Sequence, residues 1–334
     1  PRVAVERLKA FQRLFEERER KMTTYQGGEV LFGLPVHEYP KLVKIRKELR
    51  LLESLYGLYS DVLVTVGGYE DIIWSELDLE GIQQQIKGFQ DKCKRLPKAM
   101  REWEAYLELK TKIDDFDRLL PLLADLSHPA ILSRHWEAIS EVTGTKFKVD
   151  MDTFKLKNLL EATLLENEAE VHDICFAAVR EAEIETKINA LQDEWSDASF
   201  EFANFKKRGA IILNGERTQE IMSQIEDSLM VLAGLLSSPY NKPFKADILL
   251  WSQKLSTCFR EIENWVHVQS LWIYLEAVFV GGDIAKAMPL EAKRFASIDK
   301  SWVKIMNAVR DNPNVVSFVY SDETLSSLLP HLAD

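Results

Sequence analysis

The sequence predicts a mainly α-helical fold, an elongated stack of helical bundles that carries one or two small β-hairpins. Three observations predict it. Apolar residues recur at spacings of three and four over long segments, which is the period of a helix packed on one side. Short clusters of Gly, Pro, Ser and Asn separate these segments. The chain can also build sizeable cores, because 46% of its 334 residues are hydrophobic.

The N-terminal part of the chain is read as two long helices. Residues 2–25 form a charged amphipathic helix, and the glycines within residues 27–35 are expected to end it. Residues 39–66 carry the most regular apolar stripe, formed by Leu42, Ile45, Leu49, Leu52, Tyr56, Tyr59, Leu63 and Val66. A second row of leucines widens this stripe, so the helix should pack against more than one neighbour. Gly67 and Gly68 are expected to end it.

The middle of the chain continues in helices. They are expected at residues 79–126 (two helices separated near Pro97), 130–142, 156–163 and 167–195. Gly144 should stop the short helix before it, because glycine adopts the left-handed conformation that closes a helix. Residues 146–155 favour a short extended segment.

Residues 199–213 predict a β-hairpin. "SFEFANF" alternates apolar and polar residues, and a branched apolar run, "GAIILN", follows it after "KKR". The basic run in "FKKRGA" is one of two candidate patches for a polyanion, the other being "KFKVDMDTFKLK". Because the net charge is −11, a solvated face is the favoured interpretation of both patches, and no nucleic-acid partner is expected.

The C-terminal part alternates helices with strong breakers. Helices are expected at residues 215–237, 246–280 and 290–309. "SSPYNKPF" separates the first two, Gly281 and Gly282 stop the second, and "NPNVVSF" is expected to break the chain after the third.

Residues 265–280 are apolar on almost every side of the expected helix. The stretch is too short and too interrupted for a membrane span, which needs roughly 18 to 20 apolar residues, so no membrane partner is expected. A helix of this kind should be buried on several sides. The expected core of the C-terminal part is Trp265, Leu271, Trp272, Leu275 and Phe279.

The sequence offers no self-contained active site. There is no GxxxxGK[ST] phosphate loop, no HExxH and no GxSxG, and the six histidines are scattered. No catalytic, cofactor-binding or metal-binding residue is therefore proposed. The three cysteines are too few and too far apart for a disulfide framework, and the N-terminus shows no secretory signal. These features favour a reducing, intracellular compartment.

Four blocks of the chain, in the same order, resemble the linker region of dynein heavy chains. They are more similar to axonemal than to cytoplasmic heavy chains, and among the axonemal ones to those of the outer arm. They are "LFGLPVHEYPKLVKIRKELRLLESLYGLY" followed by "IIWSEL", "HWEAISEVTG", "FEFANFKKRGAIILNGERTQEIMSQIEDSLMVLAGLLSSPYNKPFKADILLWSQKL", and "WVHVQSLWIYLEAVFVGGDIAKAMPLEAKRFASIDKSW".

The resemblance implies a mechanical role. The dynein linker joins a cargo-binding tail to a ring of AAA+ modules, and its bending and straightening is the power stroke. The implied partners are the AAA+ ring of the same heavy chain, other dynein subunits of the axonemal complex, and microtubules through the parent chain only. ATP and Mg²⁺ are expected elsewhere in that chain, and the implied location is the axoneme of a cilium or flagellum.

The expected organisation follows from the breakers and the resemblance. An N-terminal helix and connection (1–34) precede the helical subdomains of residues 35–236. A candidate hinge (237–247) and a C-terminal helical subdomain (248–334) follow, and the linker is expected to be incomplete at its C-terminal end. The candidate hinge residues are Ser237, Ser238, Pro239, Tyr240, Asn241 and Pro243, because the prolines lack backbone donors and Asn tolerates unusual backbone angles. A plain loop inside one rigid bundle is the alternative interpretation of this segment.

Two other function classes remain open from the residues alone. A spectrin-like helical scaffold would show a repeat of roughly one hundred residues and no hairpin. An all-α enzyme would show a cluster of polar residues in a pocket. The sequence shows neither the repeat nor such a cluster by spacing.

Overall fold

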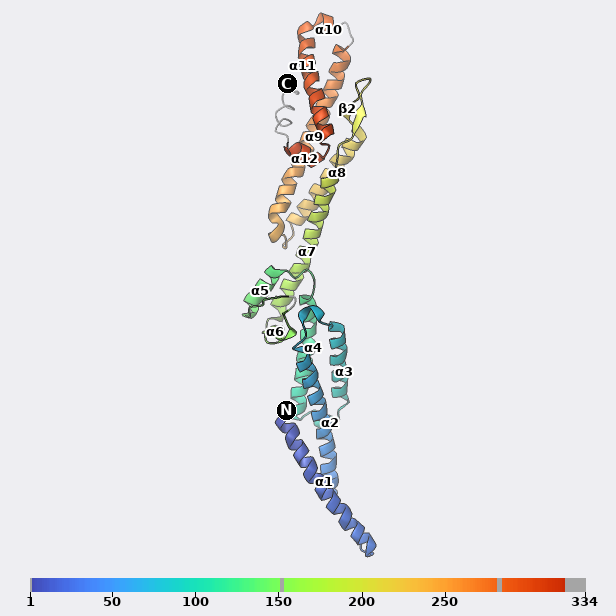
Figure 1. Cartoon of the computed structure of the whole chain (residues 1–334), viewed down its shortest axis with the longest axis vertical. Helices are drawn as coiled ribbons and strands as arrows, with labels where there is room; N and C mark the ends of the chain where they lie inside the picture. The colour runs from blue at the N-terminus through green and yellow to red at the C-terminus, as the bar shows by residue number, and fades with distance from the viewer. Residues whose placement is uncertain (1, 151–152, 281–283, 322–334) are drawn as a thin grey trace. The chain divides into compact units, whose positions relative to one another are not determined.

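The computed structural model describes residues 2–150, 153–280 and 284–321 (Figure 1). The chain divides into two compact units, Pro1–Ala178 and Val179–Asp334. The division falls inside one long helix, α7, which spans Glu168–Asp197. The fold is mainly α-helical with one small antiparallel sheet, so the predicted fold class is confirmed.

The first unit is built from helices in an up-and-down order. Its described elements are α1 (Arg2–Leu31), α2 (Pro40–Tyr69), η1 (Trp74–Glu76), α3 (Leu79–Arg95), η2 (Lys98–Met100), α4 (Glu104–Leu126), α5 (Ser133–Thr143), α6 (Leu156–Leu160) and the start of α7. Helices α2, α3 and α4 lie side by side, and α1 packs along α2 (Figure 1). α2 therefore has several neighbours, as its widened stripe predicts.

Local signals set several helix ends in this unit. The side chain of Asp78 caps α3 by accepting a hydrogen bond of 3.0 Å from the backbone N–H of Gly81. Gly144 adopts φ +67° directly after α5, which is the left-handed stop that the sequence predicts.

Two other predicted stops are wrong. α1 continues through Gly27 and Gly28 to Leu31, and α2 continues through Gly67 and Gly68 to Tyr69. Glycine lowers helix stability by only about 1 kcal/mol relative to alanine. At the end of α2 the burial of Tyr69 can offset this cost. At the exposed end of α1, Gln26 donates to the carbonyl of His37 and Glu29 accepts from the N–H of the same residue.

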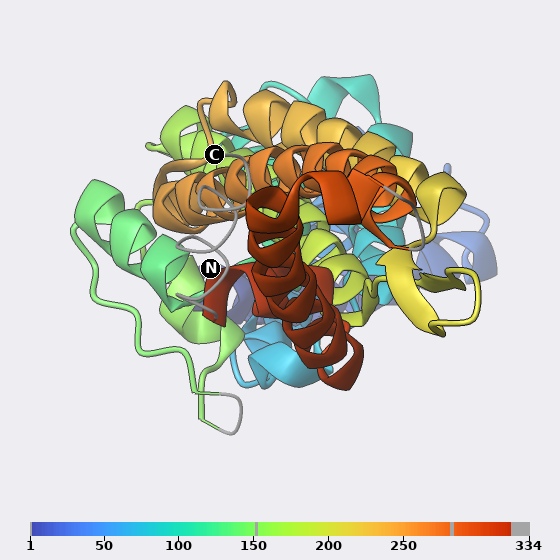
Figure 2. The ribbon, with the colours of Figure 1, turned by 90° about the horizontal axis from the view of Figure 1, so that it is seen from above.

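The second unit contains the sheet. After the end of α7 come β1 (Phe202–Asn204), β2 (Ala210–Leu213), α8 (Gly215–Leu236), η3 (Lys242–Phe244), α9 (Lys245–Phe279), α10 (Ile284–Ala287), α11 (Pro289–Asp311) and α12 (Val315–Ser321). β1 pairs antiparallel with β2, with Phe202 opposite Leu213, so the predicted hairpin is confirmed. α8, α11 and α12 each pack against α9, and the yellow hairpin lies beside the orange and red helices in Figure 2.

α9 is not buried on several sides, so that prediction is wrong. Its buried face carries Trp265, Val268, Trp272 and Glu276, spaced by three and four residues. The opposite face is open, with Tyr274 69% exposed and Leu271 40% exposed. Leu271 therefore does not belong to the core, because α8, α11 and α12 leave one side of α9 uncovered. Gly281 and Gly282, the predicted stop of this helix, lie outside the described residues.

The expected break at "NPNVVSF" is also wrong in part, because α12 begins within it at Val315. Asn314 makes this possible. Its side-chain Nδ2 donates to three carbonyl oxygens at the end of α7, those of Trp195 (3.2 Å), Ser196 (2.8 Å) and Ala198 (3.1 Å). Its Oδ1 accepts from the backbone N–H of Ser317 at 2.8 Å and so caps α12. One side chain thus ends one helix and begins another.

The three cysteines are free, and all are buried. Cys93 and Cys175 lie in the core of the first unit, and Cys258 lies in the core of the second. Burial raises the pKa of both Cys175 and Cys258 to about 12. Within the described part of the chain, every helix is too short or too polar to cross a membrane.

Replacement of Asn314 should destabilise the second unit. Asn314→Ala removes four hydrogen bonds and a helix cap, and we expect the free energy of unfolding to fall by about 1–3 kcal/mol. Urea denaturation followed by circular dichroism measures this. Asn312→Ala, at an exposed position two residues upstream, is the matched control, and an equal loss in both variants would contradict the role given to Asn314.

The buried thiol of Cys258 should make stability fall at alkaline pH. In the unfolded chain this thiol ionises near its ordinary pKa, about 9, whereas the folded protein keeps it protonated up to about 12. Between these values the unfolded state binds fewer protons, so stability present below pH 9 is lost as the pH rises. We expect the stability difference between the natural chain and Cys258→Ala to narrow from pH 8.5 to pH 11, by at most about 1.4 kcal/mol per pH unit. A pH-independent difference in urea denaturation would contradict this.

Candidate functional site: a charged clasp between the hairpin and two helices

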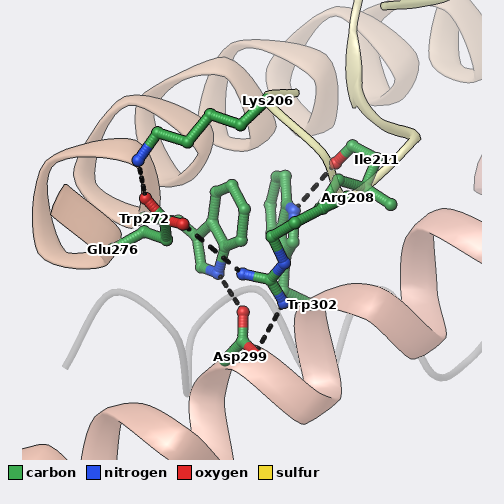
Figure 3. Close-up of polar contacts among 7 residues, drawn as sticks. All are labelled: Lys206, Arg208, Ile211, Trp272, Glu276, Asp299 and Trp302. Atoms are coloured by element: carbon green, nitrogen blue, oxygen red, sulfur yellow. Dashed lines mark hydrogen bonds and ion pairs between the residues drawn. The ribbon is translucent and has the colours of Figure 1, made fainter. Parts of the chain in front are cut away.

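A connected network of polar contacts in the described residues lies where the hairpin meets two helices. It joins the loop of the hairpin to α9 and α11 and consists of Lys206, Arg208, Ile211, Trp272, Glu276, Asp299 and Trp302 (Figure 3). We call this set the clasp. Among residues 2–150, 153–280 and 284–321, no group of three or more His, Cys, Asp or Glu side chains is placed to hold a metal ion.

The loop between β1 and β2 is shaped to present two basic side chains. The backbone N–H of Phe205 donates to the carbonyl of Gly209 at 2.8 Å, which closes the loop. Gly209 has φ +85°, a conformation that favours glycine, and Lys206 has φ +48°. A left-handed conformation costs a residue with a side chain roughly 1–2 kcal/mol, so other contacts must hold Lys206 in place.

The contact that holds Lys206 is an ion pair with Glu276 of α9. The Glu276 side chain is only 2% exposed, whereas that of Lys206 is 53% exposed. The Lys206 Nζ donates to Glu276 Oε2, and the guanidinium of Arg208 lies 4.0 Å from Glu276 Oε1. A buried carboxylate without such partners would carry a large desolvation cost.

Arg208 ties the loop to α11 as well. Its Nη2 donates to Asp299 Oδ2 at 2.7 Å, and its guanidinium lies 5.2 Å from the ring centroid of Trp272. The hydrogen bond to Asp299 is the main reason that the pKa of Arg208 is raised above its ordinary value. Arg208 is therefore a permanently charged partner at neutral pH.

Two tryptophans complete the clasp. The rings of Trp272 and Trp302 stack with centroids 5.4 Å apart at 18°. Trp272 Nε1 donates to Asp299 Oδ1 at 3.2 Å, and Trp302 Nε1 donates to the carbonyl of Ile211 at 2.9 Å. Both indoles thus pack as hydrophobic groups and also use their single donor to fix α9, α11 and β2 to one another.

A second polar residue of α9 extends this attachment. The side chain of Gln269, which is buried, accepts a 2.7 Å hydrogen bond from the backbone N–H of Leu213 and donates one of 3.3 Å to the carbonyl of the same residue. Gln269 therefore pairs with the edge of β2 as another strand would.

Most of the clasp is not predicted from the sequence. Gln269 and Glu276 count there only among the polar interruptions of an apolar helix, and a solvated face is the interpretation of "FKKRGA". The second reading is wrong for Lys206 and Arg208, which form ion pairs, although Lys207 is exposed. A usable signal was present: Gln269, Trp272 and Glu276 are spaced by three and four, so they share the buried face of α9.

The predicted core residues fall into three groups. Trp265 and Trp272 are almost completely buried, at 1% and 2% exposed. Leu275 and Phe279 are partly buried against the same core, and Phe279 stacks on Phe295 with centroids 5.8 Å apart. Leu271 lies on the open face, as described above.

The candidate hinge forms a well-bonded turn between α8 and α9. Asn241 Nδ2 donates to the carbonyls of Leu235 (3.2 Å) and Leu236 (2.6 Å), and Ser237 Oγ donates to that of Gly234 (2.8 Å). Ser238 Oγ accepts from the N–H of Tyr240 at 3.3 Å. The prolines fit the turn, since Pro239 lies within it and Pro243 is the second residue of the 3₁₀ turn η3 (Lys242–Phe244). Nothing in this geometry measures a motion, so the hinge stays a prediction.

Comparisons with known proteins agree on one family. The family model described as "Dynein heavy chain, N-terminal region 2" matches residues 42–334. The chain is 50% identical to dynein axonemal heavy chain 8 of Mus musculus over 332 residues, and 49% identical to dynein axonemal heavy chain 5 of Rattus norvegicus over 334. It is 41% identical to the dynein gamma chain of the flagellar outer arm of Chlamydomonas reinhardtii over 334 residues. These alignments cover 99–100% of this chain but only 7%, 10% and 7% of the relatives.

Removing one charge of the clasp should destabilise the chain more than removing both. Lys206→Met leaves Glu276 buried beside only the more distant Arg208, and we expect a loss of about 2–4 kcal/mol in the free energy of unfolding. In the double variant Lys206→Met with Glu276→Leu, most of this loss should be recovered, because no buried charge remains. Urea denaturation of the natural chain, both single variants and the double variant gives the coupling. Additive losses would contradict the clasp. Lys207→Met, at the exposed neighbour, is the matched control.

Proposed function

Because the chain belongs to the dynein heavy chain family, we propose that it is part of the linker of an axonemal motor and that it transmits force. In this proposal, nucleotide-driven changes in an AAA+ ring of the same heavy chain move the linker, which acts as a lever for microtubule-based movement in a cilium or flagellum. The segment itself carries out no chemistry. ATP and Mg²⁺ act in other parts of the parent chain, which is a microtubule motor.

The single observation that carries this proposal, beyond family membership, is the clasp. A lever has to pass force between its elements without gradual deformation, and close-packed interiors resist such deformation. In the second unit, the hairpin, α9 and α11 are fixed to one another by directional bonds as well as by apolar packing: Arg208 to Asp299, Trp272 to Asp299 and Trp302 to Ile211. Directional bonds oppose sliding, which apolar contacts alone permit.

The proposed partners follow from the family. They are the AAA+ ring of the same chain, other dynein subunits of an axonemal arm, and microtubules through the parent chain. The relatives include a chain of a flagellar outer arm, a chain of a flagellar inner arm and a ciliary chain. We propose the same location, the axoneme of a cilium or flagellum, for this chain.

The hinge at residues 237–247 is a separate proposal. A rotation there has to act against the packing of α8 on α9, in which Ile225 and Leu232 of α8 and Leu255 of α9 are completely buried. A hinge in this turn would therefore have to change the angle between α8 and α9 and shift this packing. Structures of the intact motor in two nucleotide states test it, and an unchanged α8–α9 angle would remove the hinge without touching the lever.

Loosening the clasp in the complete heavy chain should uncouple movement from ATP hydrolysis. Asp299→Ala removes the acceptor of both Arg208 and Trp272. We expect an unchanged microtubule-stimulated ATPase rate and a several-fold slower microtubule gliding velocity, because part of each stroke is lost to deformation. Met230→Ala, at an exposed position of α8, is the matched control.

Two results would contradict the lever. Normal gliding by a correctly folded Asp299→Ala motor would show that rigidity at the clasp is not used. Normal gliding together with loss of other dynein subunits from the purified arm would favour a scaffold that binds protein partners.

A further inference from the structure

The outer face of α11 is a row of hydrogen-bond donors. The inner face of this helix packs on the core of the second unit through Phe295, Trp302 and Met306. On the opposite side, polar side chains at spacings of three and four residues share one helix face, and each is exposed or partly exposed. We call this set the basic row, and it consists of Lys293, Arg294, Ser297, Lys300, Ser301 and Lys304.

The basic row contains no carboxylate. The acidic residues of α11 lie elsewhere, with Glu291 in the first turn, Asp299 in the clasp and Asp311 at the last position. Within the part of the chain that the structure describes, no hydrogen bond or ion pair joins a side chain of the basic row to another residue. Lys157 of α6, by comparison, pairs with Glu161 one turn later. The cations of α11 are therefore available to a partner.

Keeping these cations on one face has a cost. Lys300 and Lys304 are like charges four residues apart, a spacing that destabilises a helix. Their positive charge is also a local excess, because the chain as a whole carries a net charge of −11. An acidic partner would remove the repulsion within the row and would be attracted to it before contact. The row therefore fits a negatively charged partner that the chain as a whole would repel.

The length and chemistry of the row restrict the partner. It extends over roughly 17 Å from Lys293 to Lys304, so no single small anion reaches all of its cations. It carries no apolar side chain to insert into a lipid surface, because the apolar face of α11 is used by the core. A second helix with Asp or Glu at spacings of three and four presents carboxylates at the same intervals. Each carboxylate then accepts from a lysine, an arginine or a serine hydroxyl.

We propose that the basic row is a docking surface for an acidic helix in another part of the same motor. The proposal rests on the proposed function only in placing the partner within the motor. Three of the four cations are lysines, flexible point charges whose exposed ion pairs are individually weak. Such a contact forms and releases readily, as a contact between moving parts requires. The opposite face of α11 carries Asp299, so a force applied at the row reaches the clasp through one helix.

Carbodiimide coupling in the intact motor tests the docking. This reagent forms an amide between a lysine and a carboxylate that are in contact, and mass spectrometry identifies the pair. In at least one of two states, without nucleotide and with ATP, we expect Lys293, Lys300 and Lys304 to couple to one helix outside residues 1–334. The coupled acidic residues should be spaced by three and four. Raising NaCl from about 50 to about 300 mM should lower the yield several-fold, because salt screens exposed charges. Lys207 and Lys242, exposed lysines of the second unit, are the controls and should not couple to that helix.

Reversal of two charges gives a second readout. In Lys300→Glu with Lys304→Glu, coupling of the remaining Lys293 to the same helix should fall several-fold, because the row then repels it. Lys300→Arg with Lys304→Arg keeps the charges and should retain the coupling of Lys293. Lys207→Glu with Lys242→Glu makes the same change in net charge away from the row and should also retain it. All four substituted positions are exposed, so the thermal unfolding temperature should stay unchanged.

Four results would overturn the proposal. Absence of coupling in both states would leave the row as a solvated face. Coupling to carboxylates within residues 1–334 would assign the row to a contact inside the chain or with a second copy. Coupling of Lys293 that is unchanged in the charge-reversal variant would make the contact incidental. Binding of the motor to phosphatidylserine vesicles that the same variant abolishes would assign the row to a lipid surface. None of these results changes the ATPase and gliding assays of the clasp, so the lever is tested separately.

Discussion

The second unit depends on how one buried carboxylate is satisfied. Glu276 lies on the core face of α9, where an unpaired charge would be untenable. Its nearest partner is Lys206, and that contact holds the hairpin loop in a conformation that a lysine rarely adopts. With the loop fixed, Arg208 reaches Asp299 of α11 and lies over Trp272. This pairing therefore helps to position the hairpin on the two helices, together with the bonds of Trp302 to Ile211 and of Gln269 to Leu213.

The sequence predicts the helices well because their signals are local. The stripe of α2 and the glycine stop after α5 are each set within a few residues, and both appear in the structure. The hairpin is predicted for the same reason, since alternation over Ser199–Phe205 is a local pattern. Fold class and element type thus follow from short-range chemistry.

The sequence-based predictions are wrong where contacts between residues far apart in the chain determine the structure. Gly27, Gly28, Gly67 and Gly68 do not stop their helices, because the glycine penalty is only about 1 kcal/mol. Bonds from Gln26 and Glu29 to His37 at the end of α1, and the burial of Tyr69 at the end of α2, offset it. α12 starts where a break was expected, because Asn314 bonds to the end of α7, more than a hundred residues earlier in the chain. Leu271 is exposed because three helices cover only one side of α9. The sequence of α9 alone cannot tell which side that is.

The clasp was missed for a related reason. Gln269 and Glu276 look like defects in an apolar helix until their partners are known, and those partners are 56 and 70 positions away. Periodicity places both residues on the same helix face as Trp272. The sequence of one helix cannot show which residues of other elements they contact. A buried polar residue on such a face needs a partner, but the sequence of the helix does not say which residue supplies it.

The choice of charges at this position bears on what the unit does. A leucine at 276 against a methionine at 206 would fill similar volume, and such replacements of buried ion pairs are often neutral or stabilising. Stability alone therefore does not account for the pair. An apolar contact would tolerate a hairpin shifted along α9, whereas the set of Lys206, Arg208 and Asp299 satisfies its charges in one register only. We infer that the clasp serves to fix geometry rather than to add stability, which is the property that a force-transmitting segment of a motor needs.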